Sequence, residues 1–155
     1  MLNTIYLEKP LSAPCNKQLD VLGPEYEEIS RYIARADYIS AASVVERLFQ
    51  QGVFDVRLLG YFLFGVFTER RIAGLPVILE CLTLTLTQSL PFLGPAEKKE
   101  LQLDSALRWL LGKVVQHVEH YKRDKDPRYA QWQLPEYAGV REVALRSLQD
   151  LADVL

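Results

Sequence analysis

The chain has 155 residues, of which 49% are hydrophobic and 25% are charged. These values are typical of one globular domain that is large enough to bury a core, and they exclude a low-complexity or linker-dominated protein. The net charge of -2 gives no global basic field, so we expect no nucleic-acid partner.

The chain has two cysteines, Cys15 and Cys81. Two cysteines cannot form a disulfide framework, and neither has a spacing to another cysteine or histidine that indicates a zinc site. The first residues lack the basic region and the continuous apolar run of a secretory signal. We therefore predict a cytoplasmic protein.

Residues 1–23 have no sustained hydrophobic period, so we expect an irregular N-terminal leader ahead of a single helical domain over residues 24–155. Pro24 and the carboxylates that follow it predict a short helix, because proline is tolerated in a first turn and acidic residues favour the positive end of a helix.

Two helices with aspartate N-caps are expected next. Asp37 and Asp55 are suitable caps because a carboxylate accepts hydrogen bonds from the unpaired N–H groups of a first turn. The first of these helices is predicted to stop at Gly52, and the second is predicted to run to about Arg70.

The most apolar stretch, residues 58–86, is interrupted by the charged triplet 69–71. Each half is shorter than the roughly 20 apolar residues that a spanning helix needs, and the triplet would be costly inside lipid. We therefore predict no membrane span. We expect a central apolar helical pair, with the triplet at an exposed turn and the second helix running from after Gly74 to about Ser89. Residues 82–87 also alternate like a strand, which is the alternative there.

The clearest helical pattern runs from about Asp104 to Tyr121, with one apolar and one polar face. A polar connection over residues 123–135 and a last helix from about Glu136 follow. The prediction is an all-α, compact multi-helix domain of about six helices. The apolar stripe of the last helix either packs on this domain or contacts another subunit or further chain.

The sequence contains no recognisable catalytic motif and predicts no cofactor. His117 and His120 are three residues apart and could face a common metal on a helix. The zincin motif, however, needs two histidines four apart and a glutamate, and no third ligand is obvious here. We therefore expect neither a metal site nor an enzyme.

Aromatic and basic residues gather near the end of the chain. Tyr129 and Trp132 are of the types enriched in protein interfaces, and the other interpretation is that they close one end of the bundle. Together with Arg141 and Arg146 on the last helix, they are the residues that we predict at a protein interface.

Four groups of residues carry a resemblance to a known family. In chain order they are Pro14-Cys15-Asn16 with Leu19 and Glu25-Tyr26, then Phe54-Asp55-Val56-Arg57-Leu58, then Arg71-Ile72-Ala73-Gly74-Leu75, and finally Asp104-Ser105-Ala106-Leu107-Arg108-Trp109-Leu110. In order and spacing they resemble the N-terminal domain of the ImpA/TssA family, whose members are components of bacterial type VI secretion systems. The resemblance covers about residues 14–115. Asn16 and Val56 depart from the usual Gly and Leu, and "LPFLGPAEKKE" replaces the family's Trp-Asp/His-Pro segment.

The resemblance implies a non-enzymatic, cytoplasmic scaffold domain. It would bind other type VI secretion proteins of the baseplate, tube or sheath, coordinate or cap sheath assembly, and belong to a full-length protein that forms homo-oligomers. From the residues alone, the alternative is a generic helical adaptor or secretion chaperone of another system. Two further hypotheses are a small helical enzyme or metal protein that uses the two histidines, and a membrane-associated protein that inserts residues 58–86.

Overall fold

The computed structural model describes residues 1–11, 17–125, 127, 130, 133–139, 141–143, 145–146 and 149. Over these residues the chain is all-α, as predicted, with five named α-helices, short 3-10 and π-helical turns and no strand. The predicted number of about six helices is close to this arrangement, because residues 138–139 and the described residues from 141 to 149 are also helical.

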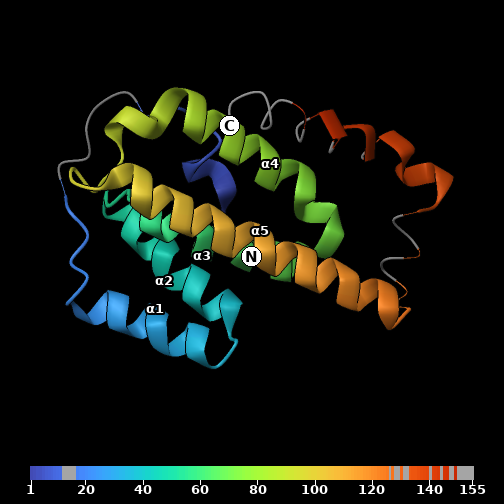
Figure 1. The fold of residues 1–155 in the computed structure, drawn as a ribbon, viewed down its shortest axis with the longest axis horizontal. Helices are drawn as coiled ribbons and strands as arrows, with labels where there is room; N and C mark the ends of the chain where they lie inside the picture. The colour runs from blue at the N-terminus through green and yellow to red at the C-terminus, as the bar shows by residue number, and fades with distance from the viewer. Residues whose placement is uncertain are drawn as a thin grey trace.

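The helices follow one another with short connections. In chain order the elements are η1 (Thr4–Tyr6), α1 (Pro24–Ala34), α2 (Tyr38–Gln50), α3 (Val56–Arg70), η2 (Arg71–Gly74), α4 (Leu75–Leu84), the π-helical turn η3 (Thr85–Ser89), η4 (Leu90–Phe92), α5 (Lys99–Arg123) and η5 (Pro135–Tyr137). The long helix α5 crosses the middle of the molecule, with α1 and α2 on one side of it and α4 on the other (Figure 1).

The predicted caps start two of these helices. The Asp37 carboxylate accepts a hydrogen bond from the Ser40 N–H at 3.2 Å, and the Asp55 carboxylate accepts one from the Arg57 N–H at 2.9 Å. Gly52 follows α2 with a φ of 84°, a left-handed conformation that glycine adopts at little cost. The predicted caps and the predicted stop at Gly52 are therefore confirmed.

Helix α3 is the centre of the core. It is apolar nearly all round, and Phe62, Phe64 and Phe67 are fully buried. It packs against both α2 and α5, and α1 packs against α2. Helix α4, the second member of the predicted pair, buries one face through Ile78 and Leu82.

The charged triplet at the end of α3 is not exposed as predicted. Glu69, Arg70 and Arg71 are each half-buried. The Glu69 carboxylate accepts hydrogen bonds from the Leu2 N–H at 3.0 and 3.2 Å, and Arg70 Nη2 donates to the Leu2 carbonyl at 3.1 Å. Arg71 Nη1 donates to the Tyr121 hydroxyl on α5. The triplet is half-buried because its charged groups form hydrogen bonds with Leu2 near the start of the chain and with Tyr121 on α5.

The N-terminal segment contributes to the core. Leu2, Thr4 and Leu7, in and around η1, are buried. Leu2 packs toward Gly65 in α3, where a Cβ would lie 3.4 Å from the leucine Cδ1. The first residues are therefore part of the same hydrophobic core as the helices.

Two other expectations about local structure have clear outcomes. Residues 82–87 are helical and not a strand. Two of their threonines donate back along the helix, Thr83 Oγ1 to the Leu79 carbonyl at 2.9 Å and Thr87 Oγ1 to the Thr83 carbonyl at 2.7 Å. Helix α5 begins at Lys99 and not at about Asp104. Its first turns belong to the helix because Leu103 and Leu107 both pack on the core.

The helical stretch from Val56 to Phe92 contains a window that is long and apolar enough to span a membrane by length and composition alone. Core helices of globular proteins pass the same test. Here most of the apolar side chains around α3 are buried in the protein core. The 3-10 turn η2 also interrupts the stretch between α3 and α4.

Candidate protein-binding site

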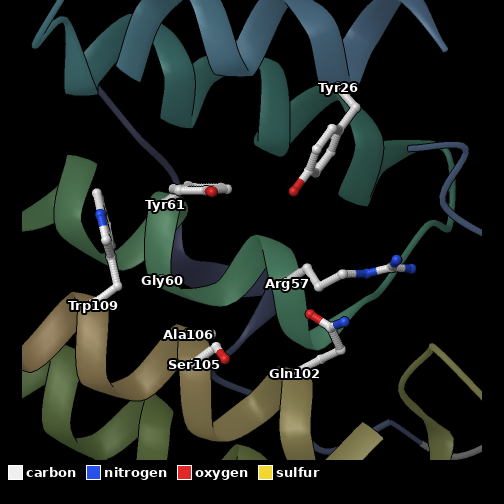
Figure 2. Close-up of a pocket in the computed structure, with 8 residues that line it drawn as sticks. All are labelled: Tyr26, Arg57, Gly60, Tyr61, Gln102, Ser105, Ala106 and Trp109. Atoms are coloured by element: carbon white, nitrogen blue, oxygen red, sulfur yellow. The ribbon is translucent and has the colours of Figure 1, made fainter. Parts of the chain in front are cut away.

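A small pocket lies where α1, α3 and α5 meet (Figure 2). Its volume is about 230 Å³. Tyr26 comes from α1, and Arg57 and Tyr61 come from α3, while α5 supplies Gln102, Ser105 and Trp109. In Figure 2 the Tyr26 hydroxyl points into the space between Tyr61 and Arg57. The pocket therefore combines aromatic walls with several polar groups.

The floor of the pocket depends on a close approach of two helices. Gly60 in α3 is buried, and a Cβ at this position would lie 3.1 Å from the Ala106 carbonyl and 3.5 Å from the Trp109 ring. A glycine therefore lets α3 and α5 come close together. The Trp109 ring then meets Tyr61 edge to face, with ring centroids 5.1 Å apart, which is a favourable aromatic geometry.

Asp55 holds Arg57 in place at the rim. Arg57 Nε donates to Asp55 Oδ1 and Nη2 donates to Oδ2, both at 2.8 Å. The Asp55 side chain is 3% exposed and the Arg57 side chain is 21% exposed. The hydrogen bonds with Asp55 raise the pKa of Arg57, so this side chain is a permanent cation at the pocket.

Tyr61 stays a neutral phenol in the physiological range. Burial, followed by the nearby Tyr26 phenol, raises the pKa of Tyr61 to about 12. Its hydroxyl can therefore both donate and accept hydrogen bonds at the pocket.

Two of the four residues that the sequence predicted at an interface, Arg141 and Arg146, are described by the structure. Tyr129 and Trp132 fall outside the described residues. Arg141 Nη1 donates to the Leu134 carbonyl at 2.8 Å, and Arg146 lies 3.7 Å from the Glu142 carboxylate in an exposed ion pair. Such exposed pairs contribute little, and neither arginine lines the pocket.

The two histidines occupy different environments. The His117 ring packs edge to face against Phe64 at 5.0 Å, and its Nδ1 lies 3.0 Å from the Lys113 carbonyl. His120 Nε2 lies 3.0 Å from the Asp124 carboxylate. Within the described part of the chain, no group of three or more histidine, cysteine, aspartate or glutamate side chains is placed to hold a metal ion.

The sequence did not indicate this pocket, although five of the residues that line it lie in the segments compared above with the ImpA/TssA family. Tyr26, Arg57 and Trp109 belong to three separate segments, and only the packing of the helices brings them together. Gln102 lies before the expected start of α5, so no signal pointed to it. No family model matches the chain, and no curated protein or solved structure matches it either.

Proposed function

We propose that this chain is a non-enzymatic protein-interaction domain of a type VI secretion component, which engages the baseplate, tube or sheath to coordinate or cap sheath assembly. The observation that supports this proposal is the convergence of Tyr26, Arg57 and Trp109 around one pocket. These residues come from three of the segments that resemble the ImpA/TssA family. The proposal places the protein in the cytoplasm, within a homo-oligomeric full-length component.

These three residues are less buried than many of their neighbours in the same segments. Many apolar residues of the same segments, such as Leu58 and Leu110, are buried, and packing alone accounts for them. Tyr26, Arg57 and Trp109 are only half-buried, and they surround a hollow that no other part of the described chain fills. Half-buried aromatic and arginine side chains are the types that carry most of the energy at protein interfaces.

Pairwise capture tests the proposal. The purified chain is immobilised and exposed separately to sheath, tube and baseplate proteins of a type VI system from the same source. We expect at least one of them to bind. The Ser105→Phe variant, which places a large ring at the mouth of the pocket, should lose that binding. Arg108→Gln is the control, because Arg108 is a 79% exposed residue of the same helix that does not line the pocket.

The result that contradicts the proposal is no binding to any of these proteins, together with normal secretion after deletion of the gene. The generic helical adaptor or secretion chaperone would use the same pocket for a partner of another system. It is favoured if the Ser105-dependent partner belongs to a different secretion pathway.

A further inference from the structure

Arg57 carries hydrogen-bond donors beyond those that Asp55 accepts, and its guanidinium group lies at the edge of the pocket, on the side away from Tyr61 and Trp109 (Figure 2). A guanidinium group has five N–H groups, and Asp55 takes one from Nε and one from Nη2. The two N–H groups of Nη1 and the second of Nη2 have no partner among the described residues. One N–H of Nη1 and the second N–H of Nη2 form the end of the guanidinium group, an edge that can bind a carboxylate with two parallel hydrogen bonds.

The charges around Arg57 favour an acidic ligand. The pocket between α1, α3 and α5 is lined by Arg57 as its only ionised side chain among the described residues. Arg57 also lines a second hollow of about 490 Å³, together with Lys17, Lys99, Asp55 and Glu97. The side chains that line the two hollows therefore carry three basic and two acidic groups. One of the acidic groups, Asp55, is paired with Arg57.

The size of the pocket limits what can enter it. A volume of about 230 Å³ lies below the roughly 300–1,000 Å³ of sites for drug-sized ligands and cofactors. It suits a single side chain. The rings of Tyr26, Tyr61 and Trp109 line it, so an apolar or aromatic side chain is the complementary group.

We propose that this site binds a short acidic segment of a partner protein. A carboxylate of the segment pairs with the Nη1 and Nη2 edge of Arg57, and a neighbouring aromatic or large apolar side chain enters the pocket between Tyr26, Tyr61 and Trp109. The chain of the partner continues into the larger hollow beside Lys17 and Lys99. This inference rests on the proposed function, because it names the chemistry of the partner at the same site.

Asp55 makes this arrangement selective. It fixes the orientation of the Arg57 side chain before binding, so less conformational entropy is lost when the complex forms. It also offsets the positive charge, so a carboxylate needs the aromatic contact in addition to the ion pair. A simple inorganic anion gains only the ion pair.

Two small probes test the chemistry directly. Phenylacetate carries a carboxylate next to a ring, and phenylacetamide is its neutral counterpart of nearly the same shape. Each is titrated into the ¹⁵N-labelled protein, and the shift of the Trp109 indole N–H resonance is followed. Because hydrogen bonds to charged groups are worth more than neutral ones, we expect phenylacetate to bind about tenfold more tightly than phenylacetamide.

The double variant Asp55→Asn/Arg57→Gln removes both charges and retains an N-cap residue at the start of α3. It should bind the two probes equally, while Arg108→Gln should keep the preference for phenylacetate. A thermal melt of each variant verifies folding. If the double variant unfolds, Ser105→Phe takes its place and should abolish binding of both probes. Equal binding of the two probes to the native chain, or an unchanged preference in the double variant, would overturn the proposal.

Two peptides test whether the site that binds the small probes also binds a segment of a protein. A tetrapeptide with blocked termini and adjacent aspartate and phenylalanine should compete with phenylacetate, and the same peptide with asparagine should not. If the acidic peptide binds but no secretion protein does, the site chemistry stands and the proposed function fails. If a secretion protein binds the native chain and the double variant equally, the proposed function stands and this inference fails.

Discussion

Asp55 and Arg57 are joined by three hydrogen bonds at the start of α3. The Asp55 carboxylate accepts from the Arg57 backbone N–H at 2.9 Å, and from Nε and Nη2 of the same residue at 2.8 Å each. One carboxylate therefore caps the central helix and orients the cation at the rim of the pocket. The start of the core helix and the candidate site depend on the same pair.

Removing only the Arg57 charge of this pair should lower the free energy of unfolding. Arg57→Gln leaves the nearly buried Asp55 carboxylate without its counter-charge, and we expect a loss of about 3 kcal/mol in the free energy of unfolding. Asp55→Asn/Arg57→Gln leaves no charge behind and should cost only about 1 kcal/mol, since asparagine is also a good N-cap. Urea unfolding of both variants measures the difference. If the double variant is as unstable as Arg57→Gln, the uncompensated carboxylate is not the cause.

Gly65 should tolerate no side chain. A Cβ there would lie 2.2 Å from the Ala42 Cβ and 2.9 Å from the Tyr38 carbonyl, so Gly65→Ala must push α2 away from α3. We expect a loss of about 3 kcal/mol, as in other overpacked cores. Gly112→Ala is the matched control. A Cβ at Gly112 meets nothing within 4 Å, and alanine should stabilise α5 by about 0.5–1 kcal/mol. Similar melting temperatures for the two variants would contradict this packing.

The N-terminal segment should be required for full stability. Leu2 is buried against α3, and its backbone is held by Glu69 and Arg70. Leu2→Ala should therefore lower the free energy of unfolding by about 2–3 kcal/mol. Ile5→Ala, three residues on at a side chain that is 47% exposed, should change it by no more than about 0.5 kcal/mol. Chemical denaturation separates the two cases, and an equal effect would show that Leu2 is not anchored in the core.

Cys81 should be chemically inert in the folded protein. Burial, followed by the charges of Glu8 and Glu80, raises the pKa of Cys81 to about 12, so the reactive thiolate is scarce at neutral pH. In a Cys15→Ser background, we expect no reaction with Ellman's reagent at pH 8 until urea unfolds the chain. Rapid labelling of the native protein would contradict the buried position of Cys81.

The raised pKa of Cys81 should also lower the free energy of unfolding at high pH. The thiol of the unfolded chain ionises near pH 8.5, whereas the folded chain keeps its proton up to a pKa of about 12. Above about pH 9 the unfolded state therefore binds fewer protons, and stability decreases as pH rises toward 12. Cys81→Ala should reduce this decrease relative to the native chain in urea titrations at pH 8 and pH 10.

The parts of the fold that local chemistry controls could be predicted from the sequence. Asp37 and Asp55 cap their helices and Gly52 stops α2, because each of these signals acts within a few residues. The start of α5 was predicted too late. Lys98, the residue before the helix, adopts a left-handed conformation and makes no side-chain cap, so the sequence carries no boundary signal there.

Features that depend on distant contacts could not be predicted. The triplet at residues 69–71 was expected to be exposed because charged residues usually are, and it is half-buried because it contacts Leu2 and Tyr121. The candidate pocket also depends on contacts between residues that are distant in the sequence. Its residues Tyr26, Arg57 and Trp109 are far apart in the sequence and meet only through the packing of α1, α3 and α5.

The proposed function is tested most sharply by the affinity of the type VI sheath, tube and baseplate proteins for the native chain, for Asp55→Asn/Arg57→Gln and for Arg108→Gln. We expect one of these proteins to bind the native chain and Arg108→Gln equally, and to bind the folded double variant at least about tenfold more weakly. Failure of all of them to bind the native chain, or equal binding to all three forms, would contradict it.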